Sequence, residues 1–252
     1  MTDASSAQRV YVNIADQLRS DIVGGIYEDG ERLPGEDELA ARFQVASRTI
    51  NRAIDLLKAD GHAVGRRGSG VYVQRPLTIR HEPFRAPDAP GWKVGSRGAV
   101  EIRALDIDQV AVISDRPPAA IASALGLDTE QPTVIWTARY SAPRRPVKLT
   151  RTYVPAALVA ENSTAGEDPT PRRLTTLLSD LGLWPEHGFV ETRGRAPGSE
   201  DCELLEIPVG RPVLDCRLTV WDAQGRALAV EQTVMDTAAY VVAHAVDLHG
   251  VR

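Results

Sequence analysis

The chain contains 252 residues, 43% of them hydrophobic, and its formal net charge at pH 7 is −5. This length allows two domains with separate hydrophobic cores, and the net negative charge disfavours nonspecific binding to polyanions. The N-terminal ten residues are polar, and no apolar run approaches the length of a membrane span. We therefore expect no signal peptide, no membrane partner and a cytoplasmic location, with Cys202 and Cys216 as buried thiols rather than a disulfide.

Two amphipathic helices are predicted near the N-terminus. In the first, over residues 10–24, apolar side chains recur every four residues, and Gly24 and Gly25 are suited to a left-handed C-cap. A polar turn leads to a second, shorter helix over residues 36–43, for which Gly35 occupies the N-cap position.

A third helix is predicted over residues 47–60, and a short turn joins it to the second in the manner of a helix-turn-helix. One face has apolar residues at helical spacing, namely Ile50, Ala53, Ile54 and Leu57. The opposite face carries Arg48, Asn51 and Arg52, whose side chains can donate to phosphates or base edges. This pattern predicts a DNA recognition helix, and the alternative for the segment taken alone is an ordinary solvated helix face.

The segment after Gly61 predicts a β-hairpin around the glycine-rich turn RRGSG. Arg66 and Arg67 lie at its tip, where they could contact a minor groove or phosphates, although a basic hairpin without a partner is an equal alternative. Residues 45–76 hold six basic residues against two acidic ones, whereas residues 1–44 hold four against nine. The basic surface is therefore confined to the third helix and the hairpin, so binding should depend on one oriented face.

The segment from Val10 to Gln74 resembles the winged helix-turn-helix of the GntR family of bacterial transcription regulators. The resemblance rests on YVNIADQLRSDIVGGIYEDGERLPGEDELAARF, TINRAIDLLKADG and RRGSGVYV. It implies that the start of the third helix and the wing tip read bases and phosphates. The DNA-binding residues that it indicates are Ser47, Arg48, Thr49, Asn51, Arg52, Arg67 and Gly68, and the hairpin tip adds Arg66.

The chain departs from the usual family pattern in the reading residues. The family usually has Ser-Arg where this chain has Ala46 and Ser47, Arg where it has Asn51, and often Arg where it has Asp37. Because a bidentate Arg reads guanine and a bidentate Asn reads adenine, we do not expect the family's usual operator sequence here.

The rest of the chain predicts a linker and a second domain. We place the winged helix at residues 8–75, a Pro/Gly-rich linker at 76–98 with one short strand at 77–80, and an effector-binding and dimerisation domain at 99–250. The linker should allow the DNA-binding domain to move relative to the second domain.

The second domain contains a weak internal repeat of about eighty residues. Its copies are IASALGLDTEQPTVIWTARYSAPRRPVKLTRTYVP and DCELLEIPVGRPVLDCRLTVWDAQGRALAVEQTVM. Each predicts a helix, a turn ending in proline, an alternating strand, a polar turn and a second alternating strand. Between them, PRRLTTLLSDLGLWP predicts another helix. Helices on an antiparallel sheet make this an α+β domain.

This half, roughly residues 99–248, resembles the UTRA effector domain of the HutC subfamily of GntR regulators, a fold shared with chorismate lyase. The resemblance implies dimerisation and a cleft for a small polar or anionic metabolite. It indicates Arg139, Thr150 and Glu231 as effector-binding residues, with Arg173 and Arg217 as weaker candidates. Arg139 could bind a carboxylate or phosphate, and the alternative for each residue is a solvated polar position on a strand.

No cofactor, metal or catalytic site is predicted. The five histidines are scattered without ligand spacing, and the sequence has no phosphate-binding glycine loop and no nucleophile elbow. We expect a homodimeric, effector-responsive transcription regulator, most simply a repressor, that binds double-stranded DNA at a palindromic operator. The alternatives are a constitutive dimeric DNA-binding regulator without an effector and, with least support, a lyase-like enzyme on the chorismate-lyase fold.

Overall fold

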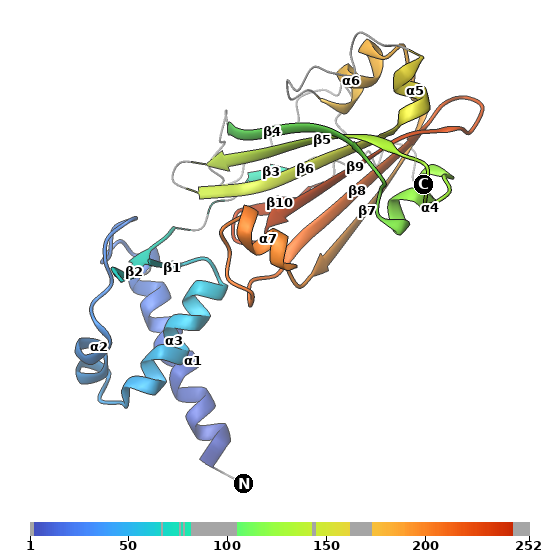
Figure 1. Ribbon diagram of the computed structural model, residues 1–252. Coiled ribbons are helices and arrows are strands. Elements are labelled where there is room, and N and C mark those ends of the chain that lie inside the picture. Colours follow the sequence, from blue (N-terminus) through green and yellow to red (C-terminus); the bar gives the residue numbers. More distant parts are fainter. Residues whose placement is uncertain are drawn as a thin grey trace, which may run out of the picture.

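The structure is a computed structural model that describes residues 3–66, 68–75, 77, 79–81, 105–142, 145–161 and 173–243, with side chains from Val10 onward. It has a helical N-terminal domain and a six-stranded sheet domain, and the helical domain lies at one end of the sheet (Figure 1). Within the described residues, no helix combines the length and apolar character needed to cross a membrane.

The N-terminal domain is the predicted winged helix. Its elements are α1 (Asp3–Val23), α2 (Glu36–Phe43), α3 (Ser47–Ala59), β1 (Ala63–Arg66) and β2 (Gly70–Val73). The predicted boundaries are correct for α2 and nearly correct for α3. Helix α1 begins seven residues earlier than predicted, because the small and polar residues before Val10 tolerate a helix but carry no apolar stripe from which to predict one.

The apolar stripes of the three helices form one core. Leu18, Leu39, Ile50 and Leu57 are all fully buried within it. Helix α1 ends as expected, because Gly25 adopts a φ of +83° and the Ile26 N–H donates to the carbonyl of Asp21, four residues before Gly25.

The second domain is built on an antiparallel sheet in the order β4-β5-β6-β9-β8-β7. The strands are β4 (Asp106–Asp115), β5 (Thr133–Ala142), β6 (Arg145–Pro155), β7 (His187–Arg195), β8 (Val213–Trp221) and β9 (Ala227–Asp236). The helices are α4 (Ala119–Leu125), α5 (Ala156–Ala160), α6 (Leu174–Asp180) and α7 (Ser199–Leu204). A separate parallel pair joins β3 (Ile79–His81), from the predicted linker, to β10 (Tyr240–Val242).

The sequence repeat is a structural repeat. Helix α4 with strands β5 and β6 corresponds to helix α7 with strands β8 and β9, and the second strands of the two copies, β6 and β9, pair at the centre of the sheet. The strand before each helix, β4 in one copy and β7 in the other, was not predicted. Both are edge strands whose residues are almost all exposed, so they lack the apolar alternation that reveals a half-buried strand.

The two faces of the sheet are covered by different elements. Alternate residues along a strand point to opposite faces, and residues paired across strands share a face. The α5/α6 face packs against α5 and α6 at one end of the sheet and against β3 and β10 at the other. The α4/α7 face packs against the two repeat helices through separate apolar clusters (Figure 1).

Candidate DNA-binding surface and effector site

Helix α3 presents the predicted reading residues on its solvent face. Arg48, Asn51 and Arg52 are exposed, whereas Ser47 and Thr49 are half-buried at the start of the helix. The guanidinium of Arg52 lies over the Tyr11 ring, with its carbon 5.8 Å from the ring centroid. Within the described part of the chain, neither Arg48 nor Arg52 forms an ion pair, so both charges remain available to an anionic partner.

The wing presents a second basic group beside this helix. The guanidinium of Arg66 stacks on Tyr72, with its carbon 4.2 Å from the ring centroid, and this contact orients the charge at the hairpin tip. Tyr72 is fixed in turn by a β-bridge to Arg32. Gly68 has a φ of +71° and open space around it, which leaves its backbone accessible to a partner. Arg67 lies outside the described residues.

The structure brings only two of the three main effector candidates together. Thr150 and Glu231 lie on the α5/α6 face, in adjacent rows of the paired strands β6 and β9. Arg139 points to the opposite face, where its Nε donates to Asp108 at 2.7 Å and its Nη1 to the carbonyl of Leu204 at 3.3 Å. The expectation of one site containing all three is therefore not met. Ala138 pairs with Thr150 and shares its face, and Arg139, the next residue along β5, points to the other face.

Thr150 and Glu231 belong to a cluster of polar groups at the middle of the α5/α6 face. The hydroxyl of Thr150 lies 3.4 Å from that of Thr233, and Thr152 donates to Glu231 at 3.4 Å. The ammonium of Lys148 lies 3.7 Å from the centroid of the Tyr140 ring. We call these six residues, Tyr140, Lys148, Thr150, Thr152, Glu231 and Thr233, the central polar cluster.

Burial perturbs the titratable groups of the central polar cluster. It raises the pKa of Glu231 above its usual value, and the nearby Lys148 and Thr152 only partly oppose this. Burial likewise lowers the pKa of Lys148, against the attraction of Glu231. An acid and a base whose charged forms are both disfavoured by their surroundings are typical of a binding or catalytic site.

Two further polar groups on this face lack partners. Among the described residues, nothing accepts the hydrogen of Trp136 Nε1 or bonds to the hydroxyl of Tyr240, although both side chains are more than nine-tenths buried. Trp136 lies in the same cross-strand row as Thr152 and Glu231. Neither residue was singled out from the sequence, since each also fits an apolar alternation.

The weaker candidates lie apart from this cluster. Arg173 is exposed and immediately precedes α6, which packs on the α5/α6 face. Arg217 lies on β8 opposite Gln232 and therefore points to the α4/α7 face. Within the described ranges, no group of His, Cys, Asp or Glu side chains is arranged to hold a metal ion. Both cysteines are free, and Cys216 is buried while Cys202 is half-buried.

A buried polar contact joins the two domains. Arg211, only 3% exposed, donates from Nη1 to Asp236 at 3.1 Å and from Nη2 to the main-chain carbonyl of Lys58. Asp236 is the last residue of β9 and is fully buried, and Lys58 lies in the last turn of α3. We call Arg211, Asp236, Lys58 and the adjoining Gly61 and Ala238 the domain junction.

These features define a class of protein. A winged helix with an unpaired basic face, joined to a sheet domain whose centre contains unsatisfied polar groups, is the arrangement of a DNA-binding regulator with a separate effector domain. The comparison with known families agrees. Residues 10–73 match the bacterial regulatory proteins of the gntR family, and residues 106–241, more than half of the chain, match the UTRA domain. The chain belongs to the GntR family of transcriptional regulators, in the HutC-type architecture that carries a UTRA domain.

Individual relatives are also transcriptional regulators, not enzymes. A protein of Escherichia coli K12 described as a probable fructoselysine utilization operon transcriptional repressor is 38% identical over 73 residues, which cover 29% of this chain and 30% of that protein. An uncharacterised HTH-type regulator of Streptomyces coelicolor is 25% identical over 238 residues, which cover 84% of this chain and 83% of the relative. The crystal structure of a GntR-family regulator matches with a TM-score of 0.57 and 20% identity over 95% of this chain and 98% of its own, and it supports the fold alone.

Proposed function

We propose that this chain is a homodimeric, cytoplasmic repressor whose binding to a palindromic operator is controlled by a small polar or anionic metabolite. The winged helix at 8–75 would place residues 47–52 in the major groove of one half-site, and its wing would contact the adjacent backbone through residues 66–68. A linker at 76–98 would connect it to an effector and dimerisation domain at 99–250.

The proposal of repression is supported by the description of the E. coli relative as a probable repressor, whose match covers 29% of this chain and 30% of that protein. The proposal of an effector is supported by the central polar cluster. Its hydrogen bonds are long, and buried polar groups without good partners are costly, so a ligand that completes their hydrogen bonds would bind favourably there.

One observation carries the proposal that the two activities are coupled. Strand β9 holds Glu231 in the central polar cluster and, five residues further along, Asp236 in the domain junction. Arg211 connects Asp236 to the end of α3 through a hydrogen bond to the carbonyl of Lys58. A ligand that prefers one position of β9 would thereby favour one position of the recognition helix, and only such differential affinity can produce control.

The DNA-binding part is tested by fluorescence anisotropy of the full chain on the DNA upstream of its own gene, across a salt series, with random DNA of equal length as the control. We expect operator binding about 10³-fold or more tighter than random binding, with a steep salt dependence. Equal affinity for the two fragments at every salt concentration would contradict sequence-specific binding at this site.

The effector part is tested by a thermal-shift screen of sugar phosphates, sugar acids and amino acids, followed by anisotropy with each stabilising compound. We expect at least one compound that lowers operator affinity in the wild type and loses this effect in Glu231→Gln, a variant that keeps the size of the side chain. If no compound changes operator affinity while specific binding persists, the alternative of a constitutive regulator is correct.

A further inference from the structure

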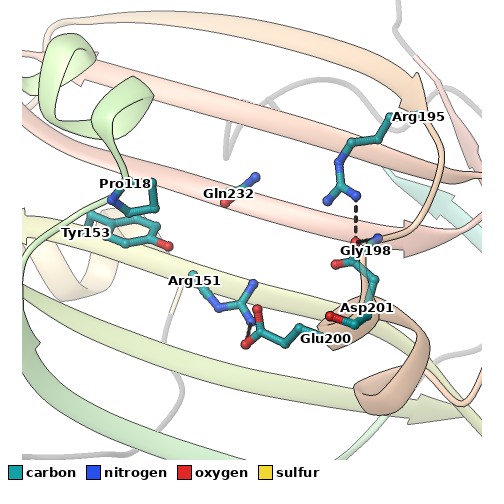
Figure 2. Close-up of a pocket in the computed structure, with 9 residues that line it drawn as sticks. Pro118, Arg151, Tyr153, Arg195, Gly198, Glu200, Asp201 and Gln232 are labelled. Carbon is teal, nitrogen blue, oxygen red and sulfur yellow. Dashed lines mark hydrogen bonds and ion pairs between the residues drawn. The ribbon is translucent and has the colours of Figure 1, made fainter.

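The α4/α7 face holds a cavity on the opposite side of the sheet from the central polar cluster. Its volume is about 320 Å³, a size that suits a small ligand. It lies over the two central strands, between the first residues of α4 and α7 (Figure 2). Arg151 and Tyr153 from β6 and Gln232 from β9 line it, and they alternate with the cluster residues along the same two strands.

One wall of this cavity is an ion-pair network with its charges satisfied. Arg195 donates to Asp201 at 2.5 Å and to Asp215 at 2.7 Å, and Gln232 Nε2 donates to Asp215 at 3.0 Å. Burial alone would raise the pKa of Asp201, but hydrogen bonds from Arg195 and from the Gly198 N–H outweigh it and hold the pKa below its usual value. The charge of Arg195 is therefore already paired within this wall.

The other wall has a cation with a replaceable partner. Arg151 is 15% exposed, and its one ion pair among the described residues is with Glu200, at 2.5 Å, whose side chain is 68% exposed. An ion pair with so exposed a partner contributes little to stability. A ligand carboxylate can therefore replace Glu200 on Arg151 at small cost, and the released Glu200 can accept hydrogen bonds from the same ligand.

Two unused hydrogen-bonding groups complete the cavity. The Tyr153 side chain is 97% buried, since its exposed fraction is 3%. Its hydroxyl has no partner in the described part of the chain and is directed into the cavity beside Arg151 (Figure 2). The amide nitrogen of Gln232 is committed to Asp215, so its carbonyl oxygen is left to accept from a ligand.

We infer that this cavity is a second ligand site, which binds a small carboxylate carrying a hydroxyl or ammonium group next to the carboxylate. The carboxylate contacts the guanidinium of Arg151 and accepts from the hydroxyl of Tyr153. The neighbouring hydroxyl or ammonium donates to Glu200 and to the carbonyl oxygen of Gln232. A neutral polyol has no anionic group for Arg151, and Glu200 would repel a phosphate dianion more strongly than a carboxylate of single charge, so the charges of the cavity favour this class.

The test is isothermal titration calorimetry of the full chain with D-gluconate and L-serine, which represent the hydroxyl and ammonium forms. D-glucitol and ethanolamine are the matched compounds without the carboxylate. We expect at least one of the two carboxylates to bind and neither matched compound to do so. Arg151→Gln and Tyr153→Phe should each weaken binding about tenfold or more, whereas Glu231→Gln, on the other face, should leave it unchanged.

Two results would overturn the inference. The first is absence of binding by both carboxylates at saturating millimolar concentrations. The second is binding that persists in Arg151→Gln and Tyr153→Phe, or that disappears in Glu231→Gln, which would place the ligand outside the cavity. Tyr153→Phe removes a single hydroxyl, so it separates a lost contact from a lost fold if Arg151→Gln is less stable in thermal unfolding.

Discussion

Gly61 at the domain junction permits a close contact with Ala238 that a larger residue would not permit, and Gly61→Ala tests this contact. Its φ is +78°, and an added Cβ would lie 2.2 Å from the Cβ of Ala238, far inside van der Waals distance. The left-handed backbone costs a non-glycine residue about 1–2 kcal/mol, and overpacking of this kind typically costs about 1–3 kcal/mol more. Gly25 is the matched control, because its φ is +83° but its added Cβ would only touch Arg75 at 3.7 Å.

Urea unfolding of Gly61→Ala and Gly25→Ala separates the two costs. Trp136, Trp184 and Trp221 lie in the second domain and the winged helix contains no tryptophan, so tryptophan fluorescence separates the second domain from the winged helix, while far-UV circular dichroism reports both domains. Gly25→Ala should move only the circular dichroism transition to lower urea concentration and leave the fluorescence transition unchanged. Gly61→Ala should lower the free energy of unfolding measured by circular dichroism by about 1–3 kcal/mol more than Gly25→Ala does. It should also shift the fluorescence transition to lower urea concentration, because Ala238 belongs to the second domain. Equal losses in the two variants, with unchanged fluorescence, would refute the contact between the domains.

Four other variants test the remaining arguments. Asn51→Ala should cost about 1–3 kcal/mol at the operator and change base preference, measured by competition with operator variants; equal losses on operator and random DNA would contradict base reading. Arg66→Ala should weaken binding to all DNA and reduce the salt slope by about 1. Arg211→Met removes the buried cation and should lower the free energy of unfolding by about 3–5 kcal/mol, and by less when Asp236→Asn is already present. Additive losses of the two substitutions in urea unfolding would exclude an interaction between Arg211 and Asp236. Burial raises the pKa of Glu231 in the folded state, so stability is highest below the unfolded pKa, where the group is neutral, and is lost as pH rises toward and through the folded pKa; relative to wild type, Glu231→Gln should therefore gain thermal stability as pH rises above the ordinary glutamate range.

The winged helix was predictable because each of its signals is local. Apolar spacing located α2 and α3, and Gly25 marked the end of α1 by the left-handed conformation that a C-cap requires. The edge strands β4 and β7 were not predictable, because a strand with both faces exposed has no alternation to read. Their existence follows only from pairing with β5 and β8, which is a property of the folded sheet.

The spatial grouping of the candidate effector residues was predictable only in part, because the faces of a sheet depend on register. Thr150 and Glu231 were placed on one face correctly, but a single residue of offset sends Arg139 to the other. Lys148 joins them although no sequence pattern distinguishes it, since a lysine on a strand is ordinarily solvated. Its position beside Tyr140 and Glu231 comes from the pairing of β5, β6 and β9, which no local pattern records.

Strands β6 and β9 are polar in the middle of the sheet, between its apolar clusters. Central strands of a covered sheet are ordinarily apolar, because both faces are buried. Here the middle of these strands is polar on both faces, with Thr152 opposite Glu231 on one and Arg151 opposite Gln232 on the other. The apolar clusters lie at the two ends of the α5/α6 face and stabilise the fold there, while Trp136 Nε1 and the Tyr240 hydroxyl lack hydrogen-bond partners among the described residues. A ligand on either face would therefore gain hydrogen bonds without disturbing those clusters, and β9 would transmit its preference to Asp236 at the domain junction.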